Sequence, residues 1–292
     1  MPPALILVTG ANGQLGKEIK DLEASYKQFR FIFLSKEDLP IHQFEQVQRY
    51  FEKQLPAYCI NCAAYTAVDK AETEKAAAML INGDATGVLA EVCALHRTKL
   101  IHISTDYVFD GTASVPYKED HSTNPVNFYG STKLKGEELC IKNNDQSIVI
   151  RTSWVYSAYG NNFVKTMVRL MKERDSLNVV SDQFGSPTYA ADLAKVIMEI
   201  IAGSERDASK WVPGIYHYSN DGIISWYDFA VAIKKLTGSK CIINPIPTTA
   251  YPTPAKRPAY SAFNKDKIQS TYQLVVEEWK TSLSAAIIRL IQ

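Results

Sequence analysis

The first half of the chain alternates two patterns of apolar residues. Short, almost continuously apolar runs are typical of strands buried on both faces; they occur at Ala4–Val8, Arg30–Leu34, Tyr58–Asn61, Leu100–Ser104 and Ser147–Arg151. Between them, apolar residues recur every three or four positions, as in amphipathic helices, at Leu15–Ala24, Phe44–Lys53 and Lys75–His96. Such alternation requires crossover connections between parallel strands. We therefore predict an α/β fold with a Rossmann-type, doubly wound parallel sheet.

The pattern changes after Arg151. Helices are predicted near 162–173 and 191–201, with a short strand at Leu177–Val180 between them. The proline-rich run from Pro245 to Pro258 predicts ordered loop, because proline lacks a backbone donor. We predict a nucleotide-binding domain formed by residues 1–153 and about 177–203, and a smaller C-terminal substrate-binding lobe formed by about 154–176 and 204–292.

Composition narrows the class of protein. The 292 residues are 46% hydrophobic and 22% charged, with a net charge of +1, so we expect no binding to nucleic acid or to an anionic membrane. No window approaches the ~18 apolar residues of a membrane span, and the N-terminus does not resemble a signal peptide. The five scattered cysteines, including the Cys59-x-x-Cys62 pair, are expected to be reduced and buried. These features predict a cytoplasmic enzyme.

A glycine-rich loop joins the first predicted strand to the first predicted helix. Glycines at every third position permit a tight turn, close approach of backbone to a diphosphate, and close packing of the helix on the sheet. Amides at the helix N-terminus favour the anion. The spacing resembles that of the short-chain dehydrogenase/reductase superfamily. We expect the loop to bind a dinucleotide through Gly10, Asn12, Gly13, Gln14, Leu15 and Gly16.

The end of the second strand predicts the preferred cofactor. NAD-selective sites usually carry a carboxylate here for the ribose 2′-hydroxyl. This chain has Ser35 and Lys36, a hydroxyl and a cation suited to a 2′-phosphate, although Glu37 and Asp38 follow directly. We therefore expect NADPH, with NADH possible, and we include Ser35, Lys36, Asp38 and Leu39 among the cofactor-binding residues.

Tyr129 and Lys133 are candidates for the chemical centre. Four residues apart, they share one face of a helix. A lysine ammonium beside a phenol lowers the tyrosine pKa and makes the phenol a general acid; the lysine can also orient the cofactor. About one Tyr-x-x-x-Lys is expected by chance in a chain with 16 tyrosines. The position of the pair, before the fifth strand, makes it a candidate site.

In short-chain reductases the preceding strand end supplies a hydroxyl to this pair. Thr105 is our candidate, with Ser104 as the alternative, and its role is a hydrogen bond to the carbonyl oxygen that is reduced. A helix or turn cap is the competing interpretation of Thr105.

Several segments together resemble the dTDP-4-dehydrorhamnose reductase family of extended short-chain reductases. They are VTGANGQLG, NCAAYTAVDKAE, STDYVFDG, NFYGSTKLKGEE, RTSWVYSAYGNNFVKTM, SDQFGSPT and IPTTAYPTPAKRPAYS, and they extend over nearly the whole chain. The resemblance implies NAD(P)H-dependent reduction of the 4-keto group of dTDP-4-dehydro-L-rhamnose to dTDP-L-rhamnose, a step in polysaccharide biosynthesis.

The resemblance also implies site residues. Ala63, Ala64 and Tyr65 would line the cofactor channel. The sugar nucleotide would meet residues from four segments: Thr66, Val68, Asp69, Thr105, Trp154, Asn161, Asn162, Phe163 and Arg257. Trp154 would offer an apolar wall to the 6-methyl group, and Arg257 would pair with the diphosphate. Core packing for Trp154 and a surface position for Arg257 are the alternatives.

The C-terminal segment bears on assembly. Trp279–Gln292 contains no Asp or Glu, so we expect no metal at a subunit contact, and a monomer or homodimer. Two other functions stay open: a reductase or epimerase of another nucleotide deoxysugar, and a non-catalytic regulatory subunit like that of methionine adenosyltransferase. The Tyr129–Lys133 pair argues against the second.

Overall fold

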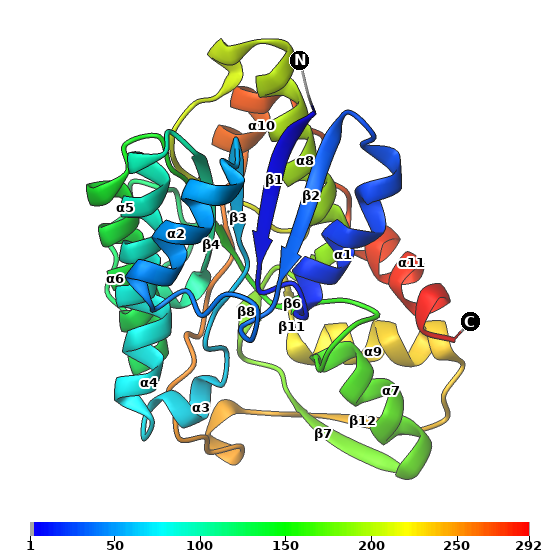
Figure 1. Ribbon diagram of the computed structural model, residues 1–292. Coiled ribbons are helices and arrows are strands. Elements are labelled where there is room, and N and C mark those ends of the chain that lie inside the picture. The colour runs from blue at the N-terminus through cyan, green and yellow to red at the C-terminus, as the bar shows by residue number, and fades with distance from the viewer. Residues whose placement is uncertain (1–2, 292) are drawn as a thin grey trace.

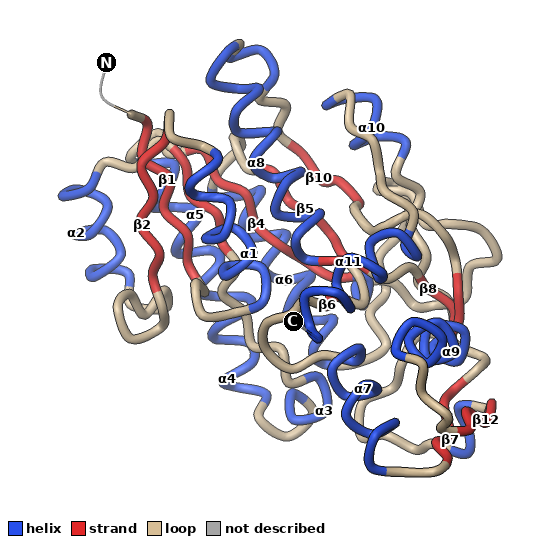
Figure 2. Tube along the Cα trace, turned by 90° about the vertical axis from the view of Figure 1, so that its right-hand side faces the viewer, coloured by secondary structure: helices blue, strands red, loops and turns tan. Residues whose placement is uncertain are grey.

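The five predicted strands all lie in one parallel sheet. In this computed structural model, which describes residues 3–291, a sixth strand completes the sheet in the order β2-β1-β3-β4-β5-β10 (Figures 1 and 2). The strands are β1 (Ala4–Thr9), β2 (Phe29–Leu34), β3 (Tyr58–Asn61), β4 (Lys99–Thr105), β5 (Ile148–Thr152) and β10 (Gly214–His217). Residues 1, 2 and 292, which the predicted domain ranges include, lie outside the described part.

Helices cover both faces of this sheet (Figure 1). Apolar residues of α2 (Phe44–Gln54), α5 (Ala85–Leu95) and α6 (Phe128–Asn143) form the core on one face. On the other face the core includes residues of α1 (Gln14–Leu22), α8 (Ala190–Arg206) and α10 (Asp266–Tyr272). The predicted doubly wound architecture is confirmed. Crossovers leave β1 and β3 in opposite directions, and ligands of such sheets bind at the carboxyl ends of the strands beside this switch.

The segment Lys75–Leu95 corrects one prediction. It is long and apolar enough to cross a membrane by length and composition, whereas no such window was expected. It comprises α4 (Lys75–Met79), a π-helical turn at Leu80–Asp84, and α5. Of the apolar window, 56% is buried inside the protein, and α5 packs between α2 and α6. Its apolar character is therefore that of a core helix.

The smaller lobe has its own core. Residues of α7 (Phe163–Glu173), α9 (Trp226–Thr237) and α11 (Trp279–Ile291) enclose it, together with the parallel pair β7 (Ser176–Val180) and β12 (Ile242–Ile246). The remaining short elements are β6 (Val155–Tyr156), which pairs with β9 (Thr188–Tyr189), β8 (Phe184–Gly185), which pairs with β11 (Ile224–Ser225), and α3 (Val68–Ala71).

Two strands, β7 and β10, do not lie in the domain to which they were assigned. β7 was assigned to the nucleotide-binding domain, but it pairs with β12 and belongs to the core of the smaller lobe. β10 was assigned to the smaller lobe, but it extends the central sheet beside β5. Strand β12 also runs through Pro245, where loop was expected. Pairing partners distant in sequence decide these placements, and local patterns do not report them.

A buried ion pair joins α6 to β5 beneath the carboxyl ends of the sheet. Arg151 donates to both carboxylate oxygens of Glu137, at 2.7–3.1 Å. Both side chains are at most 3% exposed. Ser104 also donates to Glu137, and the Arg151 guanidinium lies 5.1 Å from the centre of the Phe109 ring. The carboxylate is thereby compensated, which a buried charge requires.

Replacing Arg151 by Met should lower the free energy of unfolding by about 3–5 kcal/mol, because the Glu137 carboxylate would stay buried without its partner. The matched control is Arg169→Met, which removes an exposed pair with Glu173 and should cost less than about 1 kcal/mol. Urea denaturation at neutral pH measures both. Equal losses in the two variants would contradict the account.

Candidate active site

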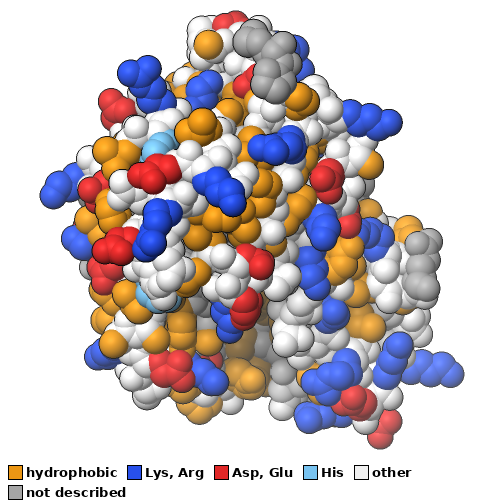
Figure 3. Space-filling model, viewed as in Figure 1, with side chains coloured by type: hydrophobic (Ala, Val, Ile, Leu, Met, Phe, Trp, Pro, Cys, Tyr) orange, Lys and Arg blue, Asp and Glu red, His pale blue; other side chains and the backbone are white. Residues whose placement is uncertain are grey.

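The carboxyl ends of β1, β3 and β4 open into a hollow between the central sheet and the smaller lobe. Figure 3 shows this hollow at the lower centre of the view, below the strand ends seen in Figure 1. The loops after β1 and β3 carry part of the predicted site residues, and the others come from β4, α1, α3, α6, the loop after β2 and the smaller lobe.

The glycine loop has no room for a side chain at Gly10. This residue has φ +66°, and a Cβ atom there would lie 2.6 Å from the Ala63 nitrogen. The Gly13 amide donates to the Gly10 carbonyl at 2.9 Å, and α1 begins at Gln14. The loop therefore exposes backbone at a helix N-terminus, which fits the diphosphate of a dinucleotide. Leu15 instead points into the core.

A cavity of about 190 Å³ adjoins this loop. It is lined by Ala11, Asn12, Lys17, Lys20, Phe33, Ser35 and Asp38. The Asp38 carboxylate accepts hydrogen bonds from the backbone and hydroxyl of Ser35, at 2.9 and 2.8 Å. Lys36 does not line the cavity: its side chain is 90% exposed and pairs with Glu37, and Leu39 is core. The cations are Lys17 and Lys20, one helical turn apart on α1, which sequence reasoning missed.

The segment after β3 is held by asparagines. The Ala63 amide donates to Asn61 Oδ1 at 3.2 Å, and the Tyr65 amide donates to Asn82 Oδ1 at 2.8 Å. The backbone of Cys62 and Ala63 thus passes directly beside Gly10, and the cofactor contacts of Ala63, Ala64 and Tyr65 stay a prediction. Thr66 is exposed.

Helix α6 brings Tyr129 and Lys133 together at the hollow. Asn127 caps the helix by accepting from the Gly130 amide at 2.7 Å. A Cβ atom at Gly130 would overlap the Tyr107 carbonyl oxygen, so glycine allows the first turn to lie against the loop after β4. The Tyr129 and Tyr107 rings meet edge to face at 5.7 Å. Tyr129 is 9% and Lys133 2% exposed.

Burial shifts the pKa of both members of this pair. Burial raises the pKa of Tyr129 above its ordinary value, the Asp106 carboxylate raises it further, and only Thr105 lowers it. Burial lowers the pKa of Lys133 to about 8. Lys133 donates to the Ile103 carbonyl at 2.7 Å. Lys133 is not among the groups that shift the Tyr129 pKa here, so the expected lowering by Lys133 stays a prediction, while burial and Asp106 keep the phenol protonated.

Thr105 is the residue whose hydroxyl lowers the pKa of Tyr129. Its oxygen accepts from the Tyr107 amide at 3.2 Å, and its proton is donated to Asp106 Oδ1 at 3.0 Å. Ser104, the alternative, donates to Glu137 on the other face of β4. Sequence reasoning gave Asp106 no role. Its Oδ2 is buried without a partner among the described residues, and burial raises its pKa to about 6.

Arg257 and Asp69, both predicted to lie near the sugar nucleotide, meet each other. The guanidinium donates from Nη2 to Asp69 Oδ2 at 2.9 Å and from Nη1 to Oδ1. The hydrogen bond from Arg257 holds the pKa of the Asp69 carboxyl below its usual range. The pair joins α3 to the proline-rich loop. The predicted contact of Arg257 with a diphosphate stays a prediction.

Three aromatic side chains of the smaller lobe pack against one another. Trp154 has φ +48° and stacks on Trp226 with ring centres 3.5 Å apart. Phe163 lies 4.6 Å from Trp226. Asn161 is exposed, whereas Asn162 caps α7 and donates to Gln14 Oε1 at 2.9 Å. Trp226 was not predicted, because nothing in the local sequence brings α9 to the RTSWVY segment.

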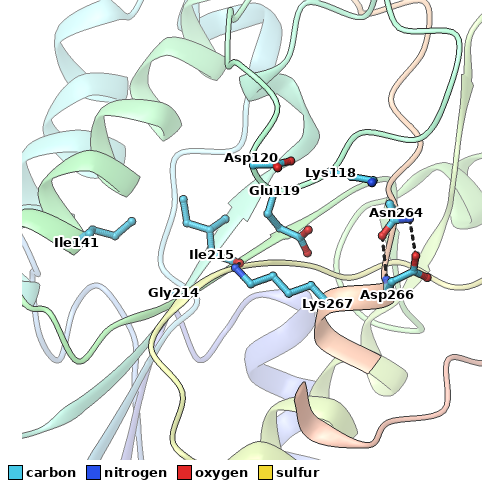
Figure 4. A pocket seen from close by; sticks show the side chains of 9 residues that line it. All are labelled: Lys118, Glu119, Asp120, Ile141, Gly214, Ile215, Asn264, Asp266 and Lys267. Carbon is cyan, nitrogen blue, oxygen red and sulfur yellow. Dashed lines mark hydrogen bonds between the residues drawn. The ribbon is translucent and has the colours of Figure 1, made fainter. Parts of the chain in front are cut away.

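A larger cavity of about 600 Å³ lies elsewhere, along the free edge of β10. Figure 4 shows side chains of both charge signs around it, and Lys267 donates to the Ile215 carbonyl at 2.8 Å. None of the predicted site residues lines it. Within residues 3–291 there is no group of three or more His, Cys, Asp or Glu side chains that could hold a metal ion.

Residues 4–291 match the family described as "RmlD substrate binding domain". The chain belongs to this family. It is 41% identical over 290 residues to a dTDP-4-dehydrorhamnose reductase of Aggregatibacter actinomycetemcomitans, covering 96% of this chain and 97% of the relative.

Solved structures agree with this family assignment. A dTDP-4-dehydrorhamnose reductase from Clostridium acetobutylicum superposes with a TM-score of 0.93 at 41% identity, over 99% of this chain and 100% of that chain. The dTDP-4-dehydrorhamnose reductase of Bacillus anthracis, in complex with NADP, gives 0.92 at 38% identity, over 98% and 99%. The Rossmann-like architecture of the chain and its resemblance to these reductases are thereby confirmed.

Replacing Asp106 by Asn tests the buried carboxyl. A folded-state pKa raised from 3.8 to about 6 gives stability that is present below pH about 4 and is lost as the pH rises through about 6. The variant escapes this loss. Its free energy of unfolding should therefore gain about 3 kcal/mol on the wild type between pH about 4 and about 7.5.

Denaturation curves at several pH values measure this difference. The control is Asp110→Asn, since hydrogen bonds lower the pKa of Asp110, and there the wild type should lose stability as the pH falls. A pH-independent difference for Asp106→Asn would show that its carboxyl is not perturbed.

Proposed function

We propose that this protein reduces the 4-keto group of dTDP-4-dehydro-L-rhamnose to dTDP-L-rhamnose with NADPH. The observation that carries the proposal is the position of Tyr129 and Lys133 on α6, with Thr105 beside Tyr129 at the end of β4 and the glycine loop at the start of α1. The similarity to dTDP-4-dehydrorhamnose reductases over 96% of the chain supports the substrate class.

The reduced nicotinamide supplies a hydride when it is bound. The alkoxide that develops on the sugar must receive a proton, and Tyr129 is the general acid placed to supply it. A phenol kept protonated by burial and by Asp106 suits this direction of the reaction. Lys133 lies one turn further along α6 and would orient the cofactor ribose.

Thr105 acts on the same oxygen through its hydroxyl. In the structure its proton is donated to Asp106, so a bond to the substrate requires the hydroxyl to rotate. Protonation of Asp106 at lower pH would release it. The apolar wall for the 6-methyl group is the Trp154 face opposite Trp226, and unused guanidinium donors of Arg257 remain for the diphosphate.

A cytoplasmic location fits a consumer of NADPH and a nucleotide sugar, and we expect a monomer or homodimer. A reductase or epimerase of another nucleotide deoxysugar would also use the Tyr129–Lys133 pair. Turnover measured with 4-keto sugars linked to dTDP and to other nucleotides distinguishes these activities. A regulatory subunit would turn over none of these sugars.

Replacing Tyr129 by Phe should reduce turnover by about 10²–10⁴-fold, because the general acid is lost while the ring is kept. The affinity for NADPH should change little. Consumption of the nicotinamide absorbance measures the first and fluorescence titration the second. Tyr117→Phe, in a tyrosine that is also buried but donates to Asp110 outside the hollow, is the matched control. Near-normal turnover in Tyr129→Phe would remove the assignment.

The cavity between Lys17, Lys20 and Ser35 predicts the cofactor preference. Two ammonium groups there outnumber the Asp38 carboxylate that also lines the cavity and favour a 2′-phosphate, so titration should give a lower Kd for NADPH than for NADH. Lys20→Met should weaken NADPH by about tenfold and NADH much less, whereas Lys36→Met, outside the cavity, should change neither. Equal Kd values for the two cofactors would contradict the preference.

A further inference from the structure

A chain of buried polar side chains runs beneath the site from the glycine loop to the Lys133 amine. The Thr9 hydroxyl donates to Asn61 Oδ1 at 2.7 Å, and Asn61 Nδ2 lies 3.0 Å from His102 Nδ1. His102 Nε2 lies 3.4 Å from Lys133 Nζ. Thr9, Asn61 and His102 are at most 1% exposed, so their polar atoms must find partners within the protein.

The backbone of Ala63 sets the direction of this chain. A backbone N–H can only donate, and that of Ala63 donates to Asn61 Oδ1. The Asn61 oxygen must therefore face Ala63 and Thr9, and its NH₂ group must face His102. Nδ1 of His102 is then the acceptor, which leaves the proton of a neutral imidazole on Nε2. Burial keeps the His102 pKa well below its ordinary value, so the ring is neutral.

The Nε2–H group points at the Lys133 nitrogen. An amine carries a lone pair that can accept this proton while the amine itself donates to the Ile103 carbonyl. An ammonium has no lone pair and would place two N–H groups face to face. With an ammonium, the chain could be satisfied at His102 only by turning Asn61, which would set its NH₂ against the Ala63 N–H. With Lys133 as an ammonium, either orientation of the Asn61 amide therefore leaves one hydrogen-bond contact unsatisfied.

We propose that His102, held by Asn61 as its Nε2–H tautomer, is a positioning residue that favours the amine form of Lys133 over the ammonium. The other groups facing Lys133 are Glu137 and Cys140 of α6 and Cys62 after β3, and they favour the ammonium. Burial and His102 oppose them. A lysine with its two forms close in free energy can give up and regain a proton during each turnover of the proposed reduction.

The tautomer of His102 is measured directly by ¹⁵N chemical shifts in protein labelled at its five histidines. The His102→Gln variant identifies the signal. We expect a protonated Nε2 and an unprotonated Nδ1 across pH about 6–9. A proton on Nδ1, or on both nitrogens, would overturn the proposal. This readout needs no turnover, so it stands apart from the proposed function.

Asn61→Asp tests the consequence for Lys133. A carboxylate has no N–H for His102, so the proton should move to Nδ1, and Nε2 should then accept from the ammonium. In the proposed function the Lys133 ammonium holds the cofactor ribose, so its loss gives the alkaline limb of the kcat/KM profile, and this limb should shift up by about one pH unit.

The carboxylate charge acts in the same direction and must be separated from the tautomer. Asn61→Asp combined with His102→Leu keeps the charge and removes the ring, and its shift should be clearly smaller. Asn144→Asp, at a buried asparagine before the amino end of β5, should not move the limb. The proposal would be overturned if the His102 proton of Asn61→Asp lies on Nδ1 and the alkaline limb of its kcat/KM profile does not move. A wild type that does not reduce the sugar would instead overturn the proposed function.

Discussion

The site depends on the burial of one lysine amine at the carboxyl end of a parallel sheet. Lys133 is 2% exposed, and removing an ammonium from water is costly unless partners replace the water. The Ile103 carbonyl and Glu137 supply that environment from β4 and α6, whereas the Nε2–H of His102 favours the amine form. Glu137 in turn requires Arg151 of β5. The packing of α6 against these strands and the protonation of the catalytic pair are therefore parts of one arrangement.

This arrangement explains why the first half of the fold could be predicted. Strands buried on both faces must be apolar throughout, and crossover helices must be amphipathic, so both leave strong local patterns. Gly10 and the Tyr129–Lys133 spacing are also local, because a tight turn and one helical turn involve neighbouring residues. The strands β1 to β5, the glycine loop and the shared face of Tyr129 and Lys133 were all found in this way.

The features that were missed depend on contacts distant in sequence. Lys36 follows the second strand, as a phosphate-binding cation would, but Lys17 and Lys20 of α1 line the cavity instead. Trp226 meets Trp154 only because α9 packs on the smaller lobe. The placements of β7 and β10 are decided by pairing with β12 and β5. The pKa of Tyr129 depends on burial and on Asp106, neither of which its spacing from Lys133 reports.

In the proposed reaction NADPH would give a hydride to the keto carbon of the sugar while Tyr129 protonates the oxygen. NADPH that carries deuterium at the transferable position of its nicotinamide ring traces this hydride. After reaction with dTDP-4-dehydro-L-rhamnose, NMR and mass spectrometry of the product locate the label. We expect one deuterium on carbon 4 of dTDP-L-rhamnose. Deuterium at another carbon, or oxidation of the cofactor without transfer to the sugar, would contradict it.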